Sequence, residues 1–163
     1  MAIRILTLFF LLPVLCYSQN TFTLAELIRM NELPEDALTK EMVHKNFSIE
    51  NRFHDTISKA LLLNFRDTSG QKLSKNWDED ANAVNYHTSF ELDFPAYRKE
   101  LLQEGFKLTD KLTGENEAVT ELYEKNMQVI SLYCSVAQSD GSPPVYEVDV
   151  SNGKGGSIST HDF

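Results

Sequence analysis

The stretch that most limits how this chain can fold is residues 93–108, which encode a short helix with both ends marked, followed by a strand. Asp93 supplies a carboxylate that can cap the first turn, and Pro95 stands where a missing backbone N–H costs little. The apolar side chains inside the segment recur every three to four residues, so they share one face of the helix. Gly105 fits the left-handed position just past the helix end. The pattern predicts a helix that turns directly into a strand.

The same pattern occurs earlier in the chain. Residues 40–47 read Lys-Glu-Met-Val-His-Lys-Asn-Phe and align with residues 99–106, which read Lys-Glu-Leu-Leu-Gln-Glu-Gly-Phe. Asn46 stands where the later segment has Gly105, and asparagine is the next-best residue for a left-handed cap. The matching caps favour a duplication, but any helix-to-strand connection has a similar pattern. Both interpretations therefore remain open on the sequence alone.

The other segments also show helical or strand periodicity. Thr23 and Glu26 form a predicted capping box at the start of one helix, and Pro34 opens a second. Strands are expected at residues 47–53, 57–66, 83–88, 106–112, 119–125, 128–137 and 145–150. The period of residues 57–66 fits helix or strand, and the repeat favours strand. Residues 72–82 are polar apart from Leu73 and Trp77, and no strand is predicted there.

These elements together predict an α+β fold. An antiparallel sheet with one apolar face must be covered, so we expect the helices to pack on one face of it. If the duplication is real, the chain has two pseudo-repeats of helix then strands, at about 23–88 and 89–151. Residues 19–151 would form a single domain, because neither half alone buries enough apolar surface to fold. Residues 152–163 are rich in glycine and small polar residues, which predicts a flexible C-terminal tail.

The first 18 residues have the features of a signal peptide. Arg4 provides a positive start, residues 5–15 are an apolar run, and small residues precede Gln19, so we expect cleavage after Ser18. The run is shorter than the roughly 20 residues that a membrane-spanning helix needs. Acylation of Cys16 in a lipoprotein is less favoured, because the preceding leucine is bulky for that position. The N-terminus therefore predicts a secreted or periplasmic protein.

The charge of the chain limits its partners. The formal net charge is −9, and an acidic chain repels phosphate backbones and anionic lipid head groups. Nucleic-acid binding and peripheral membrane binding are therefore disfavoured. Beyond the signal peptide, no apolar run is long enough to cross a bilayer.

Sequence motifs of catalysis and cofactor binding are absent. There is no nucleophile elbow, phosphate-binding loop, dinucleotide fingerprint or zinc-protease motif, and the four histidines are scattered. Cys134 lies in a predicted strand without a nearby histidine, which is typical of a small buried hydrophobe. The acidic residues at 78–82 lack the glycine and the final glutamate of a calcium loop. We predict no catalytic residues, no metal ligands and no cofactor.

Aromatic residues are the remaining candidates for a site, and those on or near the strands are Trp77, Tyr123, Tyr133 and Tyr146. Aromatic side chains on a sheet can anchor a partner, and they can equally belong to the core or to cross-strand pairs. The predicted function is a non-enzymatic binding or accessory protein with an unknown protein or glycan partner. The alternative is a small hydrolase or glycan-acting enzyme whose carboxylates, among them Glu121, Glu124 and Glu147, converge in three dimensions.

The chain also resembles a group of known proteins. Residues 22–28 read Phe-Thr-Leu-Ala-Glu-Leu-Ile, and the helix endings Lys45-Asn46-Phe47 and Glu104-Gly105-Phe106 follow. With a signal peptide ending in Cys-Tyr-Ser-Gln, this pattern resembles small uncharacterised secreted proteins of the Bacteroidota. The resemblance implies export and a fold, and it adds no active site. In architecture alone, the paired helix-then-sheet plan is similar to the tandem halves of β-lactamase inhibitor proteins.

Overall fold

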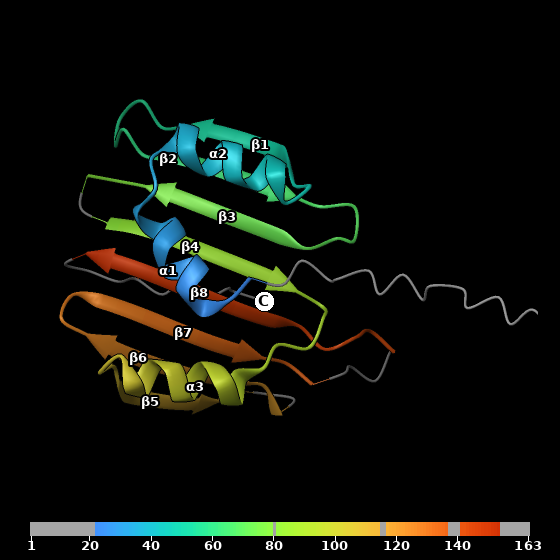
Figure 1. Ribbon diagram of the computed structural model, residues 1–163, viewed down its shortest axis with the longest axis vertical. Helices are drawn as coiled ribbons and strands as arrows, with labels where there is room; N and C mark the ends of the chain where they lie inside the picture. The colour runs from blue at the N-terminus through green and yellow to red at the C-terminus, as the bar shows by residue number, and fades with distance from the viewer. Residues whose placement is uncertain (1–21, 80, 115–116, 137–140, 154–163) are drawn as a thin grey trace, which may run out of the picture.

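The computed structural model describes residues 22–79, 81–114, 117–136 and 141–153, which hold three helices and one eight-stranded sheet (Figure 1). The helices are α1 (Leu24–Glu32), α2 (Glu35–His44) and α3 (Phe94–Gln103). The strands are β1 (Ser48–His54), β2 (Leu61–Arg66), β3 (Lys72–Trp77), β4 (Ala81–Thr88), β5 (Lys107–Thr113), β6 (Val119–Lys125), β7 (Gln128–Cys134) and β8 (Tyr146–Gly153). The predicted signal peptide lies outside the described residues.

Every neighbouring pair of strands is antiparallel, in the order β1-β2-β3-β4-β8-β7-β6-β5. The prediction of an α+β fold with an antiparallel sheet is confirmed. The expectation that no strand occurs within residues 72–82 was wrong, because residues 72–77 form β3. The strand was missed because Lys75 occupies one of its buried positions, which breaks the apolar alternation. β8 continues through Asn152 and Gly153, where the sequence predicts the start of the tail, and the rest of that tail is outside the described residues.

One face of the sheet carries the core. Residues directly opposite each other in an antiparallel pair share a face, so the strand register assigns each side chain to a face. The buried apolar side chains of one face are Leu63, Phe65, Leu73, Val84, Tyr86, Ile130, Leu132, Val148 and Val150. We call this the core face. The opposite face, called the polar face, is formed by the alternate residues Asn64, Ser74, Asn85, His87, Ser131, Tyr133, Glu147 and Asp149.

Two of the helices end in the same backbone arrangement. Asn46 follows α2 with φ 62°, and Gly105 follows α3 with φ 86°, so both lie in the left-handed region. The N–H of Phe47 reaches the carbonyl of Met42 at 2.9 Å, and the N–H of the equivalent residue after α3 reaches the carbonyl of Leu101 at the same distance. These bonds satisfy helix carbonyls that would otherwise lack partners. The prediction of left-handed caps at both positions is confirmed.

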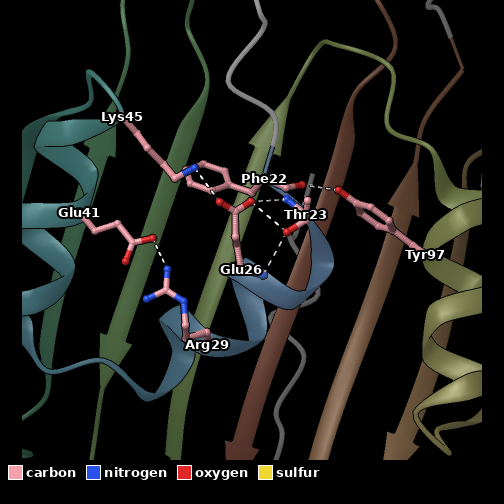
Figure 2. Close-up of polar contacts among 7 residues, drawn as sticks. All are labelled: Phe22, Thr23, Glu26, Arg29, Glu41, Lys45 and Tyr97. Atoms are coloured by element: carbon pink, nitrogen blue, oxygen red, sulfur yellow. Dashed lines mark hydrogen bonds and ion pairs between the residues drawn. The ribbon is translucent and has the colours of Figure 1, made fainter.

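The residue before the α1 cap is built into the core (Figure 2). Phe22 is 1% exposed, and the centroid of its ring lies 5.5 Å from that of Phe47 and 4.9 Å from that of Tyr86. Its carbonyl accepts a hydrogen bond from the hydroxyl of Tyr97, as Figure 2 shows. Phe22 therefore contacts residues from both halves of the chain, because Phe47 follows α2 and Tyr97 lies in α3.

Polar contacts fix α1 against α2 (Figure 2). The hydroxyl of Thr23 accepts from the N–H of Glu26 at 3.2 Å, and the Glu26 carboxylate accepts from the N–H of Thr23 at 2.8 Å. The predicted capping box is therefore confirmed. The same carboxylate pairs with Lys45 at 2.8 Å, and Arg29 pairs with Glu41. Because each of these charges is engaged by its neighbours, this cluster is structural.

Candidate functional site

The centre of the polar face holds a row of three side chains, from His87, Glu147 and Tyr133, on neighbouring strands. His87 on β4 lies opposite Glu147 on β8, which lies opposite Tyr133 on β7. Nδ1 of His87 is 2.8 Å from Oε1 of Glu147, so the carboxylate fixes the orientation of the imidazole. The row combines an aromatic ring, an imidazole and a carboxylate on three rigid strands.

A second polar row lies beside the first. Asn85, Asp149 and Ser131 occupy the same three strands, one position along on the polar face. The side-chain amide of Asn85 donates to Oδ1 of Asp149 at 2.6 Å. The two rows place the carboxylates of Glu147 and Asp149 two residues apart on β8, about 7 Å along the strand. Together they form a polar platform at the middle of the sheet.

The phenol of Tyr133 is neutral under ordinary conditions. Burial raises its pKa above the usual value, and the nearby negative charge of Glu147 raises it further. A neutral phenol donates and accepts hydrogen bonds and offers an apolar ring face to a partner. Tyr133 therefore suits recognition better than proton abstraction.

The four aromatic candidates from the sequence do not share one face. Tyr133 is on the polar face, whereas the other three lie on the core face. There Nε1 of Trp77 donates to the carbonyl of Leu33 at 3.0 Å, Tyr123 is buried, and the ring of Tyr146 packs edge-on against Phe94 with centroids 5.7 Å apart. Strand periodicity alone does not say which alternate set of residues faces the core, so the sequence could not separate these roles.

A buried carboxylate lies under α3 at Glu121, which the sequence offered only as one of three carboxylates of the enzymatic alternative. Glu121 lies on the core face of β6 and accepts from Nε of Arg98 at 2.6 Å, Nζ of Lys111 at 2.9 Å and the hydroxyl of Tyr123 at 3.1 Å. Burial raises its pKa, but the hydrogen bonds from Arg98 and Lys111 lower it more, so the net shift is downward. A carboxylate with three donors is held ionised and fully bonded, which is a structural role.

Other reactive arrangements have no support among the described residues. Burial raises the pKa of the Cys134 thiol, which makes it a poor nucleophile. The only hydrogen bond of the His87 side chain within the described part of the chain is to Glu147, so no hydroxyl is activated by this pair. In the same part of the chain, no group of three or more His, Cys, Asp or Glu side chains is placed to hold a metal ion.

A cavity of about 350 Å³ lies at the end of the sheet beside α1, and its lining consists of Glu32, Lys125, Asn126, Met127, Gln128, Asn152 and Gly153. Glu32 is the single carboxylate of this lining. Glycoside hydrolysis normally uses a pair of facing carboxylates, so the cavity does not support the enzymatic alternative.

Comparison of the chain with protein-family models, with curated proteins and with solved structures gave no match. Of the helices in the described segments, none is both long and apolar enough to span a membrane.

Proposed function

We propose that this chain is an exported, non-enzymatic binding or accessory protein that holds a protein or glycan partner on the polar face of its sheet. The observation that carries the proposal is the row of His87, Glu147 and Tyr133, whose partly exposed side chains stand on three rigid strands. Binding sites built on strands are held more precisely than sites on loops, and tyrosine is a common anchor of interfaces.

We also propose that all three helices cover the core face and leave the polar face open. Each helix makes a polar contact with a core-face side chain, and these pairs are Asn31–Lys75, Glu35–Arg52 and Arg98–Glu121. The view in Figure 1 agrees with this arrangement, because the helices are drawn in front of the strands. With the helices on one side, a partner would reach the polar face without displacing any of them.

We further propose that the chain is built of two pseudo-repeats. Both edge strands have a register shift directly after the helix cap, between Ile49 and Asn51 in β1 and between Leu108 and Asp110 in β5. Equivalent apolar residues have equal exposure, since Ile49 is 47% exposed and Leu108 is 48% exposed. Such agreement in backbone detail goes beyond what two unrelated helix-to-strand connections require.

Site-directed variants test the binding surface. Tyr133→Ala removes the ring, Tyr133→Phe keeps the ring and removes the hydroxyl, and Lys99→Ala on the exposed side of α3 is the matched control. We expect a glycan array or an affinity capture from envelope extract to identify a ligand that Tyr133→Ala binds at least tenfold more weakly, with the control unchanged. A ligand held equally by all variants, or no ligand under several conditions, would refute the proposal.

Export is tested separately. Expression of the full chain in a bacterial host, followed by fractionation and N-terminal sequencing, should place the mature protein outside the cytoplasm, beginning at Gln19. A cytoplasmic protein that retains Met1 would contradict the proposed export, and a chain that begins at a lipid-modified Cys16 would replace secretion with membrane anchoring.

A further inference from the structure

Lys75 is a fully buried lysine at the join between the sheet and α1. It lies on the core face of β3 and is 0% exposed. Its Nζ donates to two oxygens of the same residue, the backbone carbonyl and the side-chain Oδ1 of Asn31, at 2.7 Å each. Asn31 lies in the last turn of α1, where the final carbonyls have no partner within the helix. Lys75 therefore supplies, from the sheet, the hydrogen bonds that close the end of α1.

Within the described segments, the site offers Lys75 two hydrogen-bond acceptors and no carboxylate to compensate a positive charge. A neutral amine has two N–H groups, which match the two oxygens of Asn31, whereas an ammonium group has three. The ion pairs among the described residues do not include Lys75. The side-chain Nδ2 of Asn31 is itself a buried donor without a hydrogen-bond partner in the described part of the chain. The pocket is therefore built for the neutral form.

Among the described residues, the buried side chains that the neighbouring strands and the covering helices place around the amine of Lys75 are also uncharged. Its partners across the ladder are Leu63 on β2 and Val84 on β4, both fully buried. The buried side chains of the covering helices are Leu24, Leu27, Met30 and Asn31 on α1 and Leu38 and Met42 on α2. The charged side chains of these helices that form ion pairs do so elsewhere, as Arg29–Glu41, Lys45–Glu26 and Arg52–Glu35. The other charged or titratable side chains of these two helices are all exposed, and they are Glu32, Asp36, Lys40 and His44.

Trp77, on the same strand β3, holds the turn between α1 and α2 by a hydrogen bond. Two residues along β3 from the lysine, its indole N–H donates to the carbonyl of Leu33 at 3.0 Å, and Leu33 lies in the turn between α1 and α2. Nζ of Lys75 lies 5.3 Å from the centroid of the Trp77 ring. The two side chains hold one continuous piece of backbone, from Asn31 to Leu33, against the sheet.

We propose that Lys75 and Trp77 form a pH-dependent latch, which holds the end of α1 to the sheet and tightens as the solution becomes alkaline. Burial lowers the pKa of Lys75 from its ordinary value of 10.5 to about 7. Between these two values the closed latch has lost a proton that the opened latch still carries, so each unit of rising pH favours the closed form by about tenfold. Below about pH 7 both forms are protonated, and opening levels off at its greatest extent.

The protein carries its own reporter of this titration. Trp77 is the single tryptophan of the chain, and its ring lies within reach of a positive charge on Lys75. We expect the emission of Trp77, followed from about pH 5 to about pH 10, to change along a one-proton curve with its midpoint near pH 7. The variant Lys75→Met should show no such transition. In parallel, the unfolding constant of the wild type relative to Lys75→Met should fall roughly fiftyfold between about pH 7 and about pH 9.

Two further measurements keep the test decisive. His54→Gln is the matched control, because His54 lies in the same row of the ladder as Trp77, two strands away, and this variant should keep the wild-type midpoint. If Lys75→Met does not fold, ¹⁵N spectra of the wild-type lysine side chains give the titration of Nζ directly. A lysine set that titrates entirely near its ordinary value, or a transition that persists in Lys75→Met, would overturn the proposal.

Discussion

Replacing Gly105 with alanine should lower the free energy of unfolding by about 1 kcal/mol. Gly105 has φ 86°, and a Cβ added there would meet nothing within 4 Å, so the loss is conformational and includes no steric clash. An L-residue in the left-handed region costs roughly 1–2 kcal/mol. Alanine also restricts the unfolded chain, which returns about 0.4–1 kcal/mol. The difference between these two effects gives the expected value.

The equivalent position after α2 predicts a matching effect. Asn46 has φ 62°, and Asn46→Ala should also cost about 1 kcal/mol, because alanine tolerates this region less well than asparagine. The two caps lie near opposite edge strands of an eight-stranded sheet, which are separated by roughly 34 Å at about 4.8 Å per strand. Sites so far apart act independently, so the double variant should lose about 2 kcal/mol.

Urea denaturation followed by circular dichroism measures these differences, provided that the dependence on urea is the same for every variant. Gly114→Ala is the matched control, because Gly114 does not have a left-handed φ and its added Cβ would meet only the carbonyl of Ala118 at 3.9 Å. That variant should be as stable as the wild type or slightly more stable. If Gly105→Ala behaved like the control, or lost more than about 3 kcal/mol, the reasoning about the caps would be refuted.

Three further predictions concern the core and its buried polar groups. Phe22→Ala should cost about 3–5 kcal/mol in urea denaturation because it empties a fully buried aromatic site, and a loss below about 1 kcal/mol would contradict its place in the core. Tyr97→Phe should cost about 1–2 kcal/mol, because the carbonyl of Phe22 loses its hydrogen bond, and a neutral effect in the same assay would exclude that bond. Burial raises the pKa of Glu121, but its hydrogen bonds lower that pKa more, so the folded value lies below the ordinary value of 4.5. The ionised carboxylate therefore stabilises the fold above the ordinary pKa, and this stability is lost as the pH falls through the folded pKa. Glu121→Gln should therefore cost roughly 1–2 kcal/mol at neutral pH and flatten the acid limb of stability, and acid limbs of equal slope in the two proteins would contradict this.

Local signals in the sequence were sufficient to predict the ends of the helices. The carboxylate of Asp93 accepts from the N–H of Ala96 at 3.0 Å, as its position before Pro95 predicts. The caps at Asn46 and Gly105 were equally readable, because a left-handed residue is selected by the few bonds next to it. Contacts of this kind join residues two to five positions apart, so a short stretch of sequence is enough to predict them.

The proposed binding surface could not be predicted in the same way. Alternation identifies two sets of residues on a strand, but only the packing of the whole sheet decides which set is buried. The packing of the sheet places Trp77, Tyr123 and Tyr146 on the core face, and Tyr133 lies on the polar face. The row that Tyr133 joins depends on β4 pairing with β8, which brings His87 and Glu147 together across 60 positions of sequence.

The sequence by itself determined the local elements of this protein, from the capped helices to most of the strands, because each depends on neighbouring residues. Only the tertiary structure decided the strand order, the identity of the buried face and the roles of Lys75 and Glu121. A charged side chain in a sequence normally indicates solvent. Here the partners that make burial tolerable, Asn31 for Lys75 and Arg98 for Glu121, lie 44 and 23 positions away. Such partners come together only when the chain folds, so no local sequence pattern predicts these contacts.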